Sequence, residues 1–122
     1  MNDEANSRDP QAAVDFILRA APVFAKAKAE RVYLEQFRKS KKAMLMRDAE
    51  VTGVKTSAAQ ETIAYADPAY QQLLDALRDA TYSEEKAKWK LIAAQASIEI
   101  WRTQSANDRG QDRATRCAEK HL

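Results

Sequence analysis

Glycine, proline, cysteine and histidine are all scarce in this sequence. Its 122 residues include 2 Gly and 3 Pro, too few for the many tight turns of a β-sandwich or a doubly wound α/β fold. A Walker loop and a Rossmann turn also need several glycines, because the backbone approaches phosphate closely there. With 1 Cys and 1 His, a zinc finger, a disulfide framework and a His-based catalytic triad are excluded. The composition therefore predicts a largely helical protein that is not an enzyme and uses no cofactor or metal.

Long apolar segments are missing as well. No run approaches the ~20 apolar residues that a membrane-spanning helix needs. The N-terminal segment MNDEANSRD lacks the basic and apolar regions of a secretory signal, and a lone Cys117 suits a reducing compartment. At 45% hydrophobic and 31% charged residues, the chain is nevertheless too apolar to be disordered. We therefore expect a soluble, cytoplasmic protein with no membrane partner.

The small net charge of +2 hides strong segregation of charge along the chain. Residues 26–47 carry a net charge of +6, residues 48–85 carry −6, and residues 86–122 carry +4. Such alternating blocks suit pairing between copies of the chain, and they also offer a basic surface to a polyanion. A solvated helix surface is the alternative explanation for any one of these blocks.

The first long helical pattern begins at Asp9 and Pro10. Asp is a good N-cap, and Pro at the first helical position loses no hydrogen bond. Pro22 is expected to end this helix or to kink it, because proline removes one backbone hydrogen bond and clashes with the preceding turn. The pattern then resumes and continues to about Val51, where Gly53 predicts the helix end.

A short helix is expected next. Ser57 can cap it, with Gln60 three residues later completing a capping box. An Asp-Pro pair at positions 67–68 then predicts the start of another helix, in the same way as the pair at positions 9–10.

After Pro68, residues spaced by three and four positions form one long helical pattern. Its apolar positions are replaced by polar residues at 83–86. We favour one helix over residues 68–109, and the alternative is two helices hinged near Tyr82. Gly110 should end this helix. Residues 1–110 are then a single all-α domain, and residues 111–122 are a polar C-terminal tail, either frayed helix or disordered.

The segment 89–101 is apolar on more than one side of its helix. Such a helix must be buried on several sides, and a chain of this size has few elements that could cover it. We therefore predict an all-α fold, with long helices in a helical hairpin or bundle that oligomerisation completes. The residues expected at the interface between copies are Leu91, Ile98 and Trp101.

A basic stretch that follows two aromatic residues is the best candidate for a functional site. Lys and Arg neutralise phosphates, and aromatic rings stack on unpaired bases, so this combination suits single-stranded nucleic acid. The alternative is that the aromatic residues belong to the core and the basic residues only solvate a helix surface. The candidates for phosphate contact are Arg38, Lys39, Lys41, Lys42 and Arg47, and those for base stacking are Tyr33 and Phe37.

Asp75 and Asp79 lie four residues apart, on one face of a helix. Such a pair can bind a metal or act in acid–base catalysis, but no nearby His completes a site of the Glu-x-x-His type. Arg78 is close enough to make both carboxylates ordinary surface charges. We therefore assign no catalytic residue and no metal ligand.

The stretch Tyr33–Ala49, YLEQFRKSKKAMLMRDA, resembles the UvsY-type recombination mediators of tailed phages. The shared features are an aromatic–Leu pair, Lys41-Lys42, Met44-Leu45 and an acidic–Ala pair at positions 48–49, at ungapped spacing. A looser similarity in layout covers most of the chain, including a Trp-containing helix that runs into an Arg-bearing C-terminus.

The resemblance implies an all-α, ring-like homo-oligomer that binds single-stranded DNA in the cytoplasm of a bacterial host. Such mediators help a RecA-like recombinase displace single-strand-binding protein, so both proteins would be partners. The similarity places Lys41 and Lys42 beside the DNA surface. The family's basic DNA-contacting pair falls near positions 56–58 here, where only the neighbouring Lys55 is basic, and Lys55 is therefore a further candidate for DNA contact. Either the DNA face has moved to residues 38–47 or the affinity is weak.

A different function remains open. A phage-encoded helical module can bind protein alone, as a scaffold, an adaptor or an anti-defence protein. In that case the acidic block 48–85 would matter as much as the basic one.

Overall fold

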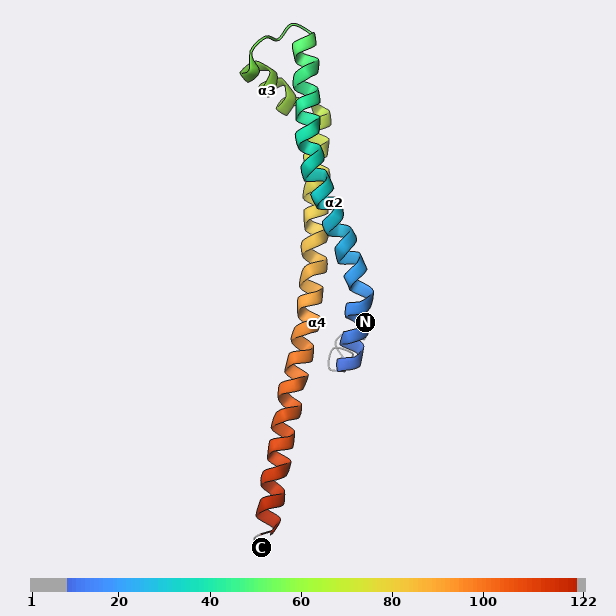
Figure 1. The fold of residues 1–122 in the computed structure, drawn as a ribbon, viewed down its shortest axis with the longest axis vertical. Coiled ribbons are helices and arrows are strands. Elements are labelled where there is room, and N and C mark those ends of the chain that lie inside the picture. Colours follow the sequence, from blue (N-terminus) through green and yellow to red (C-terminus); the bar gives the residue numbers. More distant parts are fainter. Residues whose placement is uncertain (1–8, 121–122) are drawn as a thin grey trace. The chain divides into compact units, whose positions relative to one another are not determined.

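Three helices make up 94% of the residues that the computed structural model describes, which are residues 9–120. They are α2 (Pro10–Val51), α3 (Ser57–Ala66) and α4 (Pro68–Lys120), and this part of the chain contains no strand (Figure 1). The all-α prediction is therefore confirmed. The chain divides into two units, and α2 and α4 contribute to both: one unit joins residues 1–22 with 88–122, and the other comprises residues 23–87.

Both long helices begin at an Asp-Pro pair, as predicted. The Asp9 carboxylate accepts a hydrogen bond from the Gln11 N–H at 3.0 Å, and the Asp67 carboxylate accepts one from the Ala69 N–H at 2.8 Å. Each carboxylate satisfies one of the free N–H groups of the first turn, and the proline between them has no N–H to satisfy.

The predicted end of α2 at Val51 is also confirmed. Gly53 has φ of 105°, a conformation that side chains with a Cβ rarely adopt. Its N–H donates to the Glu50 carbonyl at 3.0 Å, and the Val54 N–H donates to the Ala49 carbonyl at 3.0 Å. This pair of hydrogen bonds is the Schellman motif, which satisfies the last carbonyls of the helix.

Of the two effects expected of Pro22, an end of the first helix is wrong, because α2 continues through it, and a kink stays a prediction. Proline removes only one backbone hydrogen bond, the one to the Leu18 carbonyl, and the hydrogen bonds of the neighbouring turns hold the helix together. Leu18 and Pro22 are both exposed, so water can reach this part of the helix. The boundary between the two units falls directly after Pro22.

The predicted cap of α3 is wrong by one residue. The N-cap is Thr56, whose hydroxyl accepts a hydrogen bond from the Ala59 N–H at 3.2 Å. Ser57 is instead the first helical residue. Gln60 forms no capping box with it, because the Gln60 side chain donates to the Val54 carbonyl at 2.8 Å. Thr and Ser are both good N-caps, so the sequence alone does not separate these two positions.

The prediction of one helix over residues 68–109 is confirmed, but Gly110 does not end it. α4 runs through Gly110 to Lys120. A glycine inside a helix costs about 1 kcal/mol relative to alanine, which weakens a helix without ending it. Only Gly53 has a positive φ in the described part of the chain, so Gly110 keeps an ordinary helical backbone.

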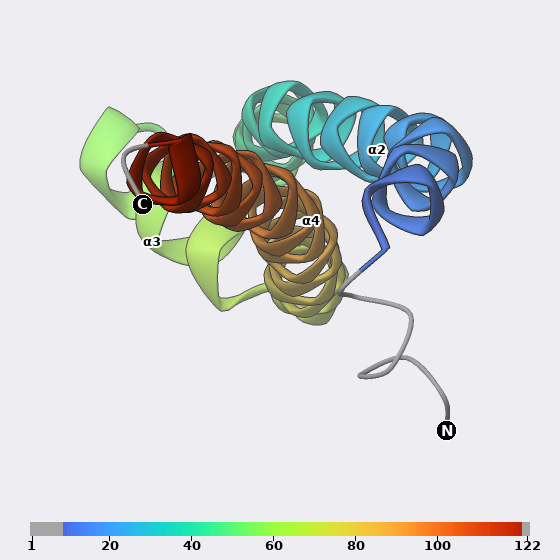
Figure 2. The same cartoon turned by 90° about the horizontal axis from the view of Figure 1, so that it is seen from below.

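In the unit of residues 23–87, α2 and α4 run antiparallel and pack along a seam (Figures 1 and 2). Buried or half-buried residues of α2 include positions 24, 27, 31, 34, 38, 41 and 45, and those of α4 include 70, 73, 77, 80, 84 and 87. These alternating steps of three and four are the heptad pattern of a coiled coil. Three seam residues are alanines, the buried Ala80 at 9% exposure and the half-buried Ala27 and Ala87, and small side chains let two helix backbones approach closely.

In the other unit, the described helical segments are residues 10–22 of α2 and residues 88–120 of α4. Ala13 and Ala94 are its buried residues within the described part. From residue 106 to residue 119, α4 is exposed throughout. No helix between residues 9 and 120 is long and apolar enough to cross a membrane.

Candidate nucleic-acid-binding surface

The residues predicted to contact phosphate lie on the C-terminal half of α2 and in the turn that follows it. Lys39, Arg47 and Lys55 are exposed, whereas Arg38, Lys41 and Lys42 are half-buried. Successive residues of a helix turn by about 100°, so Lys39 and Arg47 are about 80° apart around α2 and about 12 Å apart along it. The structure thus distributes the basic residues around α2 and leaves three of them open to a polyanion.

Lys42 is held within the chain by α3. Its Nζ lies 2.9 Å from Glu61 Oε1 and 4.7 Å from the centre of the Tyr65 ring. The interaction with Tyr65, followed by the hydrogen bond with Glu61, raises the pKa of Lys42 above its usual range. Lys42 in turn lowers the pKa of the Glu61 carboxyl. Before Lys42 could bind a phosphate, it would have to leave these two partners.

Further contacts fix α3 in the unit of residues 23–87. Ala64 is fully buried, and the Tyr65 ring meets the edge of the Tyr70 ring with the ring centres 5.4 Å apart. Gln71, in the first turn of α4, donates to the Tyr65 carbonyl at 2.7 Å. Lys42 is therefore part of a set of contacts that docks α3 on both long helices.

Tyr33 and Phe37 are not core residues of the described chain. The Tyr33 side chain is 62% exposed and Phe37 is 37% exposed. Their rings stack on each other with centres 5.9 Å apart and planes 5° apart. An exposed aromatic pair of this kind can receive either a base or the apolar surface of another protein. Base stacking by these two residues stays a prediction.

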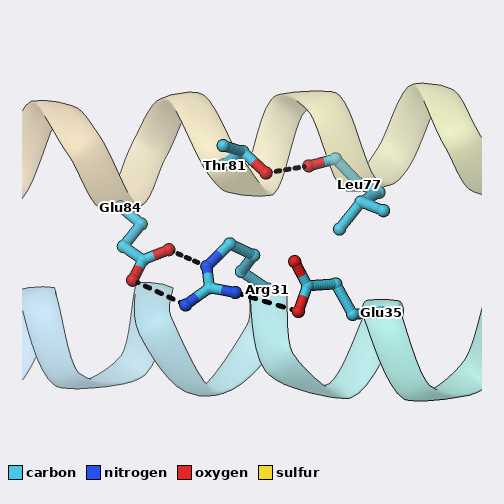
Figure 3. Close-up of polar contacts among 5 residues, drawn as sticks. All are labelled: Arg31, Glu35, Leu77, Thr81 and Glu84. Atoms are coloured by element: carbon cyan, nitrogen blue, oxygen red, sulfur yellow. Dashed lines mark hydrogen bonds and ion pairs between the residues drawn. The ribbon is translucent and has the colours of Figure 1, made fainter.

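Sequence reasoning missed a partly buried ion-pair cluster on the seam (Figure 3). Arg31 donates through Nε to one oxygen of Glu84 and through Nη2 to the other at 3.1 Å. Its Nη1 lies 3.0 Å from an oxygen of Glu35. The hydrogen bond with Glu84, and then that with Glu35, raises the pKa of the Arg31 guanidinium further.

In the sequence, this cluster is indicated by the polar residues 83–86, which interrupt the apolar pattern of the last long helix. Glu84 is only 8% exposed and takes a seam position seven residues after Leu77 and seven before Leu91. A charge at such a position needs a partner across the seam, because burying an unpaired charge is costly. The cluster joins α2 to α4 through Arg31 and Glu84, so we assign it a structural role.

The carboxylates Asp75 and Asp79 are ordinary surface charges, as predicted. Arg78 lies 3.8 Å from Asp75 and 3.4 Å from Asp79, and all three side chains are exposed. Within residues 9–120, no group of three or more His, Cys, Asp or Glu side chains could hold a metal ion.

The residues predicted at an interface between copies lie in the unit that contains residues 88–120. Leu91 and Ile98 are half-buried within the chain, and Trp101 is 44% exposed. More exposed still are two neighbours, Trp89 at 61% and Ile100 at 59%. The segment thus presents apolar side chains to its surroundings, and its role in oligomerisation stays a prediction.

No family model, curated protein or solved structure matches the chain.

Proposed function

We propose that this chain is a self-associating, single-stranded-DNA-binding recombination mediator. It would help a RecA-like recombinase load onto DNA that is coated by single-strand-binding protein. The observation that carries this proposal is the exposure of Lys39, Arg47 and Lys55. Two of these lie in the segment 26–47, which has a net charge of +6, and Lys55 follows it closely. The resemblance of residues 33–49 to UvsY-type mediators supports the class of function.

The mechanism is binding, with no covalent bond made or broken. Lysine and arginine neutralise phosphates and release the counterions that surround DNA. Contacts with three phosphates of a single strand would give affinity a slope of about −2 in a plot of log affinity against log salt concentration. Self-association would repeat the same contacts along the strand.

The experiment is an anisotropy titration of a labelled single-stranded oligonucleotide at low and at moderate salt, with light scattering on the same samples. The informative variant is Lys39→Glu/Lys55→Glu. Its matched control is Lys86→Glu/Lys88→Glu, because these two residues are also exposed and the change of net charge is the same. Loss of binding confined to the first variant supports the proposed surface. Unchanged binding in that variant refutes the surface.

A second function is favoured by the exposed apolar side chains. Tyr82 is 67% exposed, and Trp89 and Ile100 are exposed to similar extents. Large exposed apolar residues are typical of surfaces that bind another protein. If the wild-type chain binds no DNA even at low salt, we expect a helical scaffold, adaptor or anti-defence protein whose partner is a protein.

A further inference from the structure

α2 has a second heptad pattern, on a face that is turned away from the seam. We call this face the outer stripe. Its apolar members are exposed: Tyr33 at 62%, Phe37 at 37%, Met44 at 53% and Val51 at 81%. Three exposed polar residues, Glu30, Ser40 and Arg47, complete the alternating steps of three and four. The outer stripe is therefore Glu30, Tyr33, Phe37, Ser40, Met44, Arg47 and Val51, all within the unit of residues 23–87.

The spacing of the outer stripe indicates that its partner is a helix. A repeat of 3.5 residues keeps the same side chains facing a second helix as the two supercoil around each other. The seam shows that α2 already packs in this way against α4 on its other side. A helix that carries two heptad faces is suited to pack between two neighbours.

We propose that the outer stripe binds a second copy of this chain, with the two α2 helices antiparallel. In one register, Glu30 faces Arg47 of the second copy, Tyr33 faces Met44, and Phe37 faces Ser40. All three pairs share one midpoint, between residues 38 and 39. A two-fold axis at that midpoint produces each pair twice, as a closed dimer requires.

The charges of the outer stripe favour a second copy as the partner and the antiparallel orientation of the two α2 helices. Within the part of the chain that the structure describes, Glu30 and Arg47 form no ion pair. The antiparallel register gives each of them an opposite charge. A parallel pairing would instead place Glu30 against Glu30 and Arg47 against Arg47, and like charges at an interface are strongly unfavourable. The same side-chain chemistry joins Arg31 to Glu84 on the seam.

This inference rests on the self-association in the proposed function, but it requires no DNA. Pairing would cover Tyr33 and Phe37, which assigns these rings to the second copy instead of to bases. Lys39 follows Phe37 by two residues, about 200° around the helix, so it stays open to phosphate. Arg47 belongs to both surfaces, and for that reason the DNA-binding variant above leaves it unchanged.

The test is sedimentation equilibrium without DNA, over a wide range of protein concentration. The wild-type chain should self-associate. Glu30→Arg and Arg47→Glu should each weaken association by at least about tenfold, because each places like charges together. The double variant exchanges the two charges and should restore association. A mixture of the two single variants should form a mixed pair in preference to either variant alone.

The control is Lys28→Glu, an exposed residue on a different face of α2. It should associate as the wild-type chain does. All the substituted residues are exposed, and circular dichroism checks that each variant keeps its helix content. A wild-type chain that stays monomeric, a single variant that associates normally, or a folded double variant that stays dissociated would each overturn the proposal. None of these outcomes depends on whether the chain binds DNA.

Discussion

Two nitrogens of the Arg31 guanidinium in α2 donate to the two oxygens of the Glu84 carboxylate in α4, across 53 residues of sequence. The pair lies on the seam, where the residues around it are apolar or small. Sliding one helix by a turn would separate the two charges and leave Glu84 buried without its main partner. The ion pair therefore fixes the register of the two helices, and this use of a buried polar group is known from coiled coils.

The first prediction follows from this pair. Glu84→Ala should lower the Tm by about 5–10 °C, because the half-buried Arg31 keeps its position and loses its main partner. Thermal unfolding followed by circular dichroism measures this change. The exposed neighbour Glu85 provides the control, and Glu85→Ala should leave the Tm almost unchanged. Equal effects of the two variants would show that the ion pair has no special role.

The docking of α3 should weaken at acid pH. Lys42 lowers the pKa of Glu61, so the folded state holds this carboxylate charged at a pH where the unfolded chain protonates it. The stabilisation is present above the ordinary pKa of 4.5 and is lost as the pH falls through the lowered value. Lys42 has a raised pKa, so its own contribution is present at neutral pH and is lost only in strong alkali.

NMR signals of the Tyr65 ring report this transition directly. They should shift as the pH falls below 4.5 in the wild-type chain. In Glu61→Gln the same signals should show no such titration, because the carboxylate is missing. If the Tyr65 ring signals still shift below pH 4.5 in Glu61→Gln, the effect belongs to another group.

The two glycines should respond to the same substitution with opposite signs. A Cβ at Gly53 or at Gly110 would meet no atom within 4 Å, so crowding plays no part in either case. Gly53→Ala should destabilise the fold by about 1–2 kcal/mol, because φ of 105° is unfavourable for alanine. Gly110→Ala should stabilise α4 by about 0.5–1 kcal/mol. Urea denaturation measures both changes, and two changes of the same sign would contradict this account.

Lys39 should matter more than Lys42 for binding single-stranded DNA. Lys39 is exposed, whereas Lys42 is engaged with Glu61 and Tyr65. Lys39→Ala should weaken binding and reduce the steepness of the log–log salt dependence by about 0.7, the value for one lost phosphate contact. Lys42→Ala should change the slope little. Anisotropy titrations at several salt concentrations compare the two variants, and a larger loss of slope in Lys42→Ala would move the DNA surface toward α3.

Trp101 should contribute to self-association. It is 44% exposed in the described chain, so a large apolar area is open to a neighbour. Trp101→Ala should weaken association and leave the helix content of the single chain almost unchanged. Light scattering and circular dichroism separate these two effects. Thr103→Ala, at another exposed position of α4, is the control. A Trp101→Ala variant that associates as tightly as the wild-type chain would remove Trp101 from the interface.

Most of the helix boundaries could be predicted because capping is local. Asp9, Asp67 and Gly53 each act on hydrogen bonds within a few residues, so their effect is visible in the sequence. The errors arose where a weak local signal was given too much weight. Gly110 and Pro22 each disturb one turn of a helix, and the remaining turns continue it.

The site was harder to predict, because its contacts join distant residues. The hydrogen bond from Lys42 to Glu61 spans 19 residues and that from Arg31 to Glu84 spans 53. Neither leaves a pattern in one short segment, so Lys42 looked as available to DNA as Lys39. The polar residues around Glu84 did indicate a contact across the seam, but the sequence did not identify Arg31 as the partner.

The buried alanines of the described chain have a consequence for how the protein folds. Five of the seven buried apolar residues in the described part of the chain are alanines, and an alanine gains little from leaving water. A single copy therefore gains little free energy of folding from apolar burial. Each apolar side chain that a second copy covers increases that gain. Folding and assembly should then be one equilibrium, whose midpoint rises as the protein becomes more concentrated.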